Sequence, residues 1–598
     1  MSLAVVGIFI VKAVFVVMFG MNLAVVLTWV DRRQGAVLAD RVGPNRAVVW
    51  LPQRVAQALA AGPALLVAAG IIAYVATTKA EGVERTTQAL WFSQLAIFAT
   101  WLTGLFIAGR VAARGINRSA PQLILQLDRF FASIGDPRRF FYAGIVVHLA
   151  TLLIAATFRG TAVGHSLREF AYGGGPAVLA FAIVFGAVYA AGSMTDERIG
   201  LRLAGLLHPA ADGLKTMFKE DFVPKNADRF LHSLAPFISF FPVLVVLAVV
   251  PFGDTLCFGM KNGHIDLTQL AKVVPREGVC TEGAVTLQAL DLNVGILFFF
   301  ALAGTGIVGA ALAGWASDNK FSLLGGLRAA SQMVSYEVTL GLTLIGAIMV
   351  YGTLRIDDMV RWQAEHTWGI FVQPFAFFLF FAAQVAESKR TPFDLPEGES
   401  EIVAGYFTEY SGMKFAMFFF SEYVAVVAGA ALMSAIFLGG WDLPFIDRDG
   451  LRIAVGDTVL VHEQLSHLSV VLLGFFGFIA KTAALCWLSI TIRWTLPRFR
   501  YDQLMRLGWR KLLPASLVNI LATGLLILGI GSASASVQEG LRIAEDVSQI
   551  FLAAVGLVLV VWFVRFLLEP AQKRRLVITS AQRFAASLGG TQRARMGA

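Results

Sequence analysis

Apolar segments of membrane-spanning length, separated by polar loops, recur from one end of the chain to the other. A helix that crosses a bilayer needs about 20 predominantly apolar residues. Thirteen segments are of about that length: Val5–Trp29, Leu59–Thr77, Leu90–Gly109, Phe140–Phe158, Pro176–Met194, Ser233–Phe252, Leu292–Gly314, Gly326–Gly352, Gly369–Ala386, Phe415–Gly440, Leu468–Ile492, Leu512–Ser532 and Ile550–Leu568. The pattern predicts an all-α polytopic membrane protein, because membrane β-strands would alternate polar and apolar residues over about ten positions.

The composition excludes a disordered chain and an ordinary soluble enzyme. Of 598 residues, 57% are hydrophobic and 15% are charged, against roughly 25% charged in soluble domains. The formal net charge is +9, from 49 basic and 40 acidic residues. No nucleic-acid motif accompanies this charge, so we expect it to mark cytoplasmic loops and not a nucleic-acid partner.

Basic residues collect after the first span, between the third and fourth, after the eleventh, and in the C-terminal tail. Such residues favour the cytoplasmic side. We therefore expect a multi-pass protein with its N-terminus outside and its C-terminus in the cytoplasm. The first span lacks a basic leader and a small-residue cleavage site, so we expect it to be retained.

The chain holds three cysteines, Cys257, Cys280 and Cys486. Cys257 and Cys280 lie in a long segment predicted to face outward, where they can form a disulfide or remain as two thiols. Cys486 lies inside a predicted span, where it packs. The sequence shows no phosphate-binding loop, no Rossmann fingerprint and no CxxC metal pair, so no metal site and no redox cofactor of its own is expected.

The stretch from Glu387 to Lys414 is both acidic and apolar. Its carboxylates are Glu387, Asp394, Glu397, Glu399, Glu401 and Glu409. Aromatic residues lie among them, and Pro392 and Pro396 stiffen the backbone. We expect a loop folded into the protein, whose crowded carboxylates titrate as a coupled unit. The alternative is a solvated acidic docking surface.

Two further carboxylates, Glu337 and Glu422, lie within predicted spans. Carboxylates are costly in a bilayer and usually face a cavity or a polar partner. With the acidic loop they favour a proton route, and the alternative is structural pairing. Between Arg202 and Arg229, apolar residues recur at helical spacing beside charged ones, which predicts an amphipathic helix on the cytoplasmic surface.

These segments together resemble one family, the quinone-chamber membrane subunit of proton-pumping NADH:quinone oxidoreductase (respiratory complex I), known in bacteria as the H subunit. The matching segments are RVGPNR (Arg41–Arg46), ADGLKTMFKED (Ala211–Asp221), DLNVGILFF (Asp291–Phe299), GWASDNKFSLLGGLRAASQMVSYE (Gly314–Glu337), the acidic loop, GMKFAMFFFSEY (Gly412–Tyr423) and LPRFRYDQLMRLGW (Leu496–Trp509). The resemblance covers about residues 1–46 and 203–532.

The resemblance implies a multi-pass subunit of the bacterial inner membrane, beneath the peripheral arm of the complex, with a tunnel for ubiquinone or menaquinone. Quinone would be reduced at an iron–sulfur cluster bound by a partner subunit, with FMN also in a partner. Antiporter-like and small membrane subunits would be further partners, and lipid surrounds them. The chain would thus be a subunit of a proton-translocating enzyme, without activity alone.

Site residues follow by position. The resemblance assigns the quinone chamber and tunnel to Arg32, Arg33, Arg41, Arg46, Asp212, Lys215, Lys219, Glu220, Arg390 and Arg493. It assigns coupling to the carboxylates of the acidic loop, and an intramembrane proton route to Glu337 and Glu422. Two positions depart from the family's pattern: Asp31 stands where Glu is usual, and His208 stands where Gln is usual, with a hydrogen-bonded structural role the simpler interpretation.

The largest departure is roughly 155 residues between GPNR and the segment matching LLHPAADG. The expected domains are a first core helix with its basic segment (1–46), an inserted four-helix membrane module (47–202), a core bundle (203–532), and an extra helix with a basic tail (533–598). The core would then hold eight or nine helices and the insert about four.

Two other functions remain open: the homologous subunit of a membrane-bound hydrogenase, and a stand-alone cation transporter, for which no inverted repeat is seen.

Overall fold

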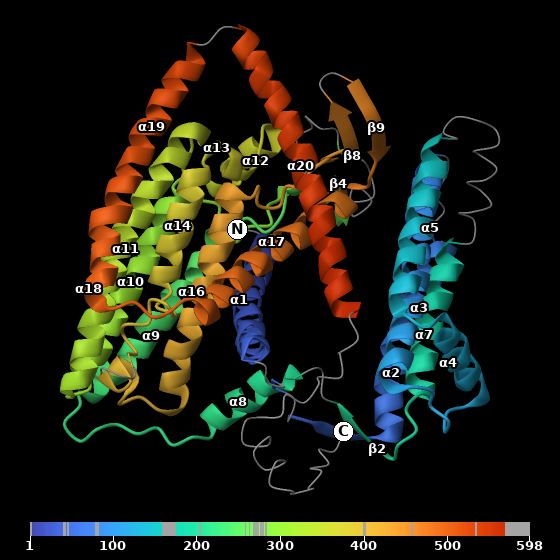
Figure 1. Cartoon of the computed structure of the whole chain (residues 1–598), viewed down its shortest axis with the longest axis horizontal. Helices are drawn as coiled ribbons and strands as arrows, with labels where there is room; N and C mark the ends of the chain where they lie inside the picture. The colour runs from blue at the N-terminus through green and yellow to red at the C-terminus, as the bar shows by residue number, and fades with distance from the viewer. Residues whose placement is uncertain are drawn as a thin grey trace, which may run out of the picture. The chain divides into compact units, whose positions relative to one another are not determined.

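The computed structural model describes residues 3–39, 43–44, 47–77, 83–157, 175–201, 205–257, 259–261, 264–266, 274, 280, 284–398, 402–455, 458–532 and 535–568. The elements are mostly helices, as Figure 1 shows. Within the described residues, ten helices are long and apolar enough to cross a membrane. The chain is therefore an all-α multi-pass membrane protein, as the sequence predicts.

Three predicted spans are not among those ten helices. Phe140–Phe158 falls on α5 (Pro137–Thr157), and Ile550–Leu568 falls on α20 (Ala535–Leu568). The span at Gly369–Ala386 is divided into α13 (Gly369–Val372) and α14 (Pro374–Glu387), because the backbone leaves the helical conformation at Gln373. The exact number of membrane spans stays a prediction.

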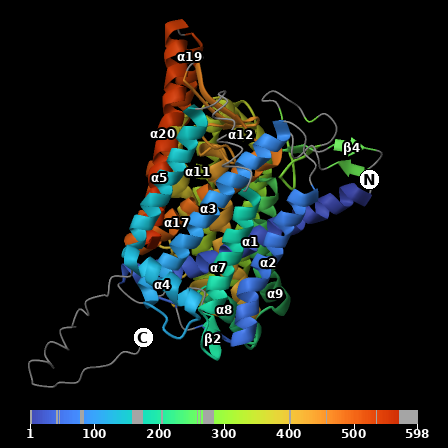
Figure 2. The same ribbon diagram turned by 90° about the vertical axis from the view of Figure 1, so that its right-hand side faces the viewer.

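The chain divides into two compact units, residues 1–49 with 200–554, and residues 50–199 with 555–598. The described helices of the second unit include α2 (Gln53–Thr77), α3 (Val83–Arg114), α4 (Gln122–Ile134), α5 and α7 (Gly175–Gly192). Helix α7 packs against both α2 and α3, and α3 also packs against α4 and α5. Strands β1 (Val49–Pro52) and β2 (Arg198–Leu201) pair where the chain enters and leaves this group of helices. Figure 2 shows these helices side by side, with α4 near their lower end.

The first unit is a helical bundle around α16 (Gly412–Phe437). Helices α1 (Leu3–Leu38), α9 (Arg229–Val246), α14 and α17 (His467–Thr495) pack against α16. Helix α10 (Gly295–Ala316) packs between α9 and α11 (Lys320–Tyr351), and α19 (Leu513–Gly531) packs against α11.

Small residues set the spacing between some of these helices. A Cβ atom on Gly309 would lie 2.7 Å from the backbone nitrogen of Ser239, and one on Gly326 would lie 2.9 Å from the carbonyl oxygen of Ala310. Apolar helices in a membrane gain little from hydrophobic burial, so close approach through small residues is a main source of packing energy. These glycines therefore fix α10 against its two neighbours.

One end of the bundle, the loop end, carries the acidic loop, α8 (Leu207–Met217), the short 3-10 turn Gly405–Phe407, α18 (Tyr501–Arg506) and the π-helical turn Leu507–Leu512. The other end carries the strand pairs β3–β6 (Leu256–Cys257, Ala284–Val285) and β4–β5 (Gly259–Lys261, His264–Asp266), the three-stranded sheet β7–β8–β9 (Ile446–Asp447, Gly450–Val455, Thr458–Gln464), and α12 (Ile356–Glu365). Helices α9 and α16 begin at the loop end and run toward the other.

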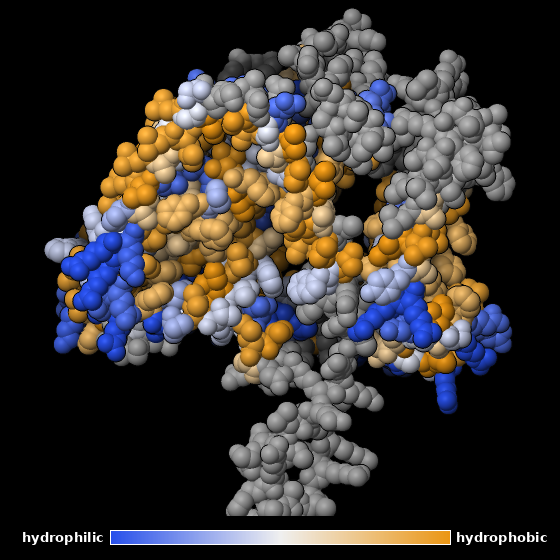
Figure 3. All heavy atoms as spheres, turned by 45° about the horizontal axis from the view of Figure 1, so that its top comes forward, coloured by the Kyte–Doolittle hydropathy of each residue, from blue (hydrophilic) through white to orange (hydrophobic). Residues whose placement is uncertain are grey.

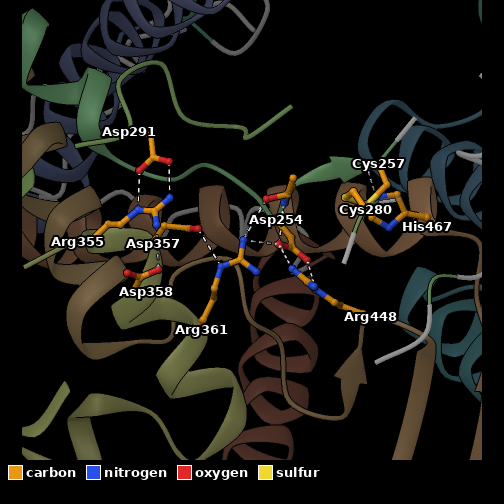
Figure 4. Close-up of polar contacts among 11 residues, drawn as sticks. Asp254, Cys257, Cys280, Asp291, Arg355, Asp357, Asp358, Arg361, Arg448 and His467 are labelled. Carbon is orange, nitrogen blue, oxygen red and sulfur yellow. Dashed lines mark hydrogen bonds and ion pairs between the residues drawn. A yellow bond between two sulfur atoms is a disulfide. The ribbon is translucent and has the colours of Figure 1, made fainter. Parts of the chain in front are cut away.

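The second end, called here the disulfide end, is held by a covalent bond and by ion pairs (Figure 4). Cys257 and Cys280 form a disulfide, and the backbone N–H of Cys257 donates to Nε2 of His467 at 3.0 Å. The carboxylate of Asp254 lies 2.7 Å from Arg448 and 3.2 Å from Arg361. These contacts join the loop after α9 to α12, α17 and the β7–β8–β9 sheet. The remaining cysteine, Cys486, is free and buried.

Candidate functional site

The described part of the acidic loop is folded against the bundle. The side-chain amide of Gln332 donates to the carbonyl oxygens of Ala386 at 2.7 Å and Phe393 at 2.9 Å. The ring of Phe393 stacks on Phe499 with 5.2 Å between centroids, and Tyr406 is 1% exposed. Burial of these aromatic side chains thus holds the loop against the bundle, and this places the loop's charged residues beside the helices.

Arg390 and Glu422 form the most deeply buried ion pair among the described residues. Their nearest nitrogen and oxygen atoms lie 3.0 Å apart, and the two side chains are 9% and 1% exposed. The guanidinium also lies over the ring of Tyr423, 4.1 Å from its centroid. On the other carboxylate oxygen, Tyr406 donates its hydroxyl at 3.5 Å. Since an unpaired charge is very costly here, each partner requires the other.

Asp31 joins three helices next to this pair. Its carboxylate accepts hydrogen bonds from the hydroxyl of Tyr423 at 2.8 Å and the indole N–H of Trp494 at 2.8 Å, and it pairs with Arg493. Gly35 makes room for the indole, because a Cβ there would lie 2.5 Å from the ring of Trp494. Helices α1, α16 and α17 therefore meet at one buried carboxylate.

Asp394 is buried in the acidic loop beside charges of both signs. Arg498 lies 3.0 Å from its carboxylate. Burial nevertheless raises the pKa of Asp394 to about 8, with the negative charge of Glu397 as the next cause, and Arg498 only partly opposes them. This carboxyl group can therefore exchange a proton near neutral pH, as the crowding of acids predicts.

A cavity extends from the acidic loop into the bundle. Its polar lining includes Glu337, Gln384, Glu387, Lys389 and Glu422, and apolar residues of α9, α10, α11 and α16 complete it. The cavity volume is about 60 Å³, and at roughly 10–15 Å³ for each water this is room for about four to six waters. The cavity is therefore wide enough for a short hydrogen-bonded water chain.

Two glycines create the space that these polar groups occupy. A Cβ on Gly304 would lie 2.8 Å from a carboxylate oxygen of Glu337, and one on Gly429 would lie 1.9 Å from the amide nitrogen of Gln384. Within the described part of the chain, Oε2 of Glu387 is buried without a hydrogen-bond partner. A buried carboxylate of this kind is satisfied by protonation or by water.

Other residues assigned from the resemblance lie elsewhere at the loop end. Arg32 pairs with Asp212 at 2.6 Å, with both side chains about half exposed. The carboxylate of Glu409 accepts a hydrogen bond from Asn319 at 2.7 Å. Exposed side chains at this end are Arg33, Lys215, Lys219 and Glu220. None of these residues lines the cavity. Arg41, Arg46, Glu399 and Glu401 lie outside the described residues.

Several residues at or beside the cavity were not assigned to the functional site from the sequence. Lys389 and Gln384 line the cavity, and Asp31 with Tyr423 and Trp494 supports it. The available signal was polarity within or beside an apolar span, which is costly and needs a reason. His208 lies 3.2 Å from the carbonyl oxygen of Gly205, in keeping with the structural interpretation of that residue. Among the described residues, no group of three His, Cys, Asp or Glu is placed to bind a metal.

This chain is similar to known proteins over most of the first unit and over α7 of the second unit. The sequence profile of a family described as NADH dehydrogenase matches residues 176–524. The second H subunit of NADH-quinone oxidoreductase from Geobacter metallireducens is 43% identical over 323 residues, covering 54% of this chain and 83% of the relative. The first H subunit from Cytophaga hutchinsonii is 40% identical over 339 residues, covering 56% and 89%. The first H subunit from Geobacter sulfurreducens is 44% identical over 324 residues, covering 54% and 82%.

The start of the profile match, in α7, draws attention to a short repeat. DRRQGAVL (Asp31–Leu38) follows the apolar part of α1, and DERIGLRL (Asp196–Leu203) follows α7, with the shared pattern Asp-x-Arg-x-Gly-x-x-Leu. In the structure, α1 packs against α16 and α17, whereas α7 packs against α2 and α3. Asp31 is 6% exposed and contacts the site, while Asp196 is exposed in the second unit. Of the two copies, the first one supplies the buried carboxylate.

Proposed function

Because the chain belongs to the H-subunit family of NADH-quinone oxidoreductase, we propose that its loop end forms the quinone chamber of that enzyme. It is a membrane subunit of complex I and works with the other subunits of the complex. The names of the relatives favour this function over a hydrogenase-type complex and over a stand-alone transporter. The proposal concerns which residues bind quinone and pass on the effect of its reduction.

The buried Arg390–Glu422 pair carries the proposal. It lies where the acidic loop meets the cavity, so one partner comes from the loop and the other lines the route into the bundle. A quinone head group is neutral and becomes more negative as it takes up electrons. A nearby guanidinium stabilises that added charge, which weakens its hold on Glu422 and raises the proton affinity of that carboxylate.

Protons taken up at the loop end would then be exchanged through the cavity. Glu422, Glu387 and Glu337 line it, and the space for water between them permits hydrogen-bonded transfer. Asp394 is a second exchangeable group, since its pKa lies near neutrality. Electrons would come from an iron–sulfur cluster and FMN in partner subunits, and antiporter-like subunits would move the protons across the membrane.

The disulfide supports an orientation in the bacterial inner membrane. Disulfides persist in oxidising compartments such as the periplasm, so the disulfide end would face outward and the loop end the cytoplasm. The N-terminus would then lie outside and the C-terminus inside, as the basic loops favour.

We also propose that residues 47–202 are a module inserted into the family's architecture, between a first core helix (1–46) and the core bundle (203–532), with an additional helix and tail at 533–598. The compact unit that comprises residues 50–199 and 555–598 has boundaries close to 47 and 202, which supports the insertion. The repeat after α1 and α7 supports an insert whose end duplicates the segment that follows the apolar part of the first core helix.

Substitution of a cavity carboxylate tests the proposal. Glu337→Gln removes one proton acceptor with little change in shape, and we expect it to slow NADH-driven quinone reduction several-fold and to lower proton uptake per quinol. The assay is quinone reduction in membranes, with a water-soluble acceptor that takes electrons before the quinone as the measure of intact complex. The change to Glu399→Gln or Glu401→Gln in the acidic loop is expected to act similarly while assembly persists.

Glu365→Gln is the matched control, because Glu365 is exposed at the end of α12 and lies outside the cavity. It should leave both activities unchanged. Full coupled turnover in Glu337→Gln would contradict the proton route, and equal loss with the soluble acceptor would indicate failed assembly.

A further inference from the structure

Helix α4 is amphipathic, and it presents a second apolar strip away from the helices on which it packs. Ile124 and Phe131 are buried against the second unit. Leu123 and Phe130, seven residues apart and thus on one face, are 56% and 60% exposed. Exposed apolar side chains on a short amphipathic helix are typical of a segment that lies in the headgroup region of a membrane.

Exposed arginines lie on α4 and in the segments that flank it in the chain. Arg114 ends α3, Arg118 lies in the turn before α4, Arg129 is on α4, and Arg139 is in the first turn of α5; all four are exposed. None of the four has a carboxylate within 4.0 Å among the described residues. Figure 3 shows hydrophilic and hydrophobic spheres adjoining at this end of the second unit, at the lower right.

The helix is held in place by a buried acid. Asp128, 2% exposed, accepts hydrogen bonds from the hydroxyl of Tyr189 at 2.7 Å and from the backbone N–H of Asn117 at 3.2 Å. The amide of Asn117 donates in turn to the carbonyl oxygen of Ser193 at 3.3 Å. The cationic face is therefore pre-organised, because α4 is tied to α7 and to the turn that carries Arg118.

We propose that this face, formed by Arg114, Arg118, Arg129 and Arg139 around Leu123 and Phe130, is a binding site for the phosphate headgroup of an anionic membrane phospholipid. The arginines supply charge-assisted hydrogen bonds to phosphate oxygens. The two apolar side chains enter the acyl region beside that headgroup. An acidic soluble protein would match the charge but leave Leu123 and Phe130 in water, so the membrane lipid is the occupant that satisfies both parts of the face.

The test measures lipid selectivity of the assembled complex that contains this chain. The charge-removing variant is Arg118→Gln/Arg129→Gln/Arg139→Gln, and the matched control is Arg118→Lys/Arg129→Lys/Arg139→Lys, which keeps all three charges. Each complex is purified in neutral detergent, exposed to a fluorescent phosphatidylglycerol or phosphatidylcholine probe, and assayed for bound probe. Each basic residue near a lipid surface contributes about fivefold to anionic binding, so we expect the Gln variant, which loses three of them, to lose about tenfold to hundredfold of its phosphatidylglycerol preference.

The Lys control should retain most of that preference, and raised salt should weaken it in the unchanged protein. A Gln variant that assembles normally and still prefers phosphatidylglycerol as the wild type does would overturn the proposal. If the Gln variant does not assemble, Leu123→Ser/Phe130→Ser provides the second test: it should weaken probe binding, and unchanged binding would again count against the site. Loss of a co-purifying acidic protein with no change in bound lipid would show that the face binds protein instead.

Discussion

Removing one partner of the Arg390–Glu422 pair should destabilise the chain more than removing both. At the 3.0 Å separation of these atoms, attraction in an effective dielectric of about 20 amounts to about 5.5 kcal/mol, since 332/(20 × 3.0) ≈ 5.5. Much of this offsets the cost of taking both charges out of water. Loss of one partner leaves the other charge buried and unpaired, which costs about 3–5 kcal/mol.

We therefore expect Glu422→Gln and Arg390→Gln each to lower the free energy of unfolding by about 3–5 kcal/mol, whereas Arg390→Met/Glu422→Met should lose less than either single variant. The measurement is unfolding of the purified chain in mixed micelles as denaturing detergent is increased. Asp221→Asn is the control, because the side chain of Asp221 is half exposed in its pair with Lys414 and such a pair is worth less than about 1 kcal/mol.

All three variants at the buried pair should lose quinone reduction, including the more stable double variant. Additive losses of stability would refute the reasoning, because they would mean that neither charge depends on the other. A double variant with wild-type quinone reduction would show that the pair is structural only.

The second prediction concerns the repeat after α1 and α7. Asp31→Asn should lower both the rate of quinone reduction and the thermal stability in membranes, whereas Asp196→Asn, at the equivalent position of the second copy, should change neither. The opposite ranking would place the functional copy after α7. The third prediction concerns Asp394, whose pKa is raised from 3.8 to about 8. Between these two pH values the folded chain keeps a proton on Asp394 that the unfolded chain releases. The contribution of this group to stability is therefore complete below about pH 4 and is lost as the pH rises through about 8. Glu397→Gln should lower that pKa and Arg498→Gln should raise it, so the inflection of the quinone reductase rate against pH should move to lower pH in the first variant and to higher pH in the second. Shifts in the same direction would show that another group controls the profile.

The sequence predicted the helical membrane architecture because apolar runs of 20 or so residues have few other uses. It also predicted a folded acidic loop, because Phe393 and Tyr406 lie among the carboxylates and were buried as expected. The division of the Gly369–Ala386 segment was not predicted. Its apolar run is continuous in composition, and the break at Gln373 depends on the backbone that surrounds it.

Pairings within the site could not be predicted from the sequence. Arg390 and Glu422 lie 32 positions apart, and Asp31 and Arg493 lie 462 positions apart. Which cation meets which acid depends on how α1, α16 and α17 pack, and charge patterning alone does not determine helix packing. The cavity depends on glycines 304 and 429, whose importance appears only when the opposing side chains are in place.

The two ends of α16 are secured by different chemistry. Around the end near Cys257 a covalent bond adds to the ion pairs of Asp254, and the strength of that bond does not depend on protonation. Around the end near Arg390 the principal contacts are between ionised groups, so their strength depends on protonation. A change in charge near Arg390 should therefore alter contacts at the loop end of the bundle while the disulfide end keeps its covalent link, which confines any rearrangement to one end of α16.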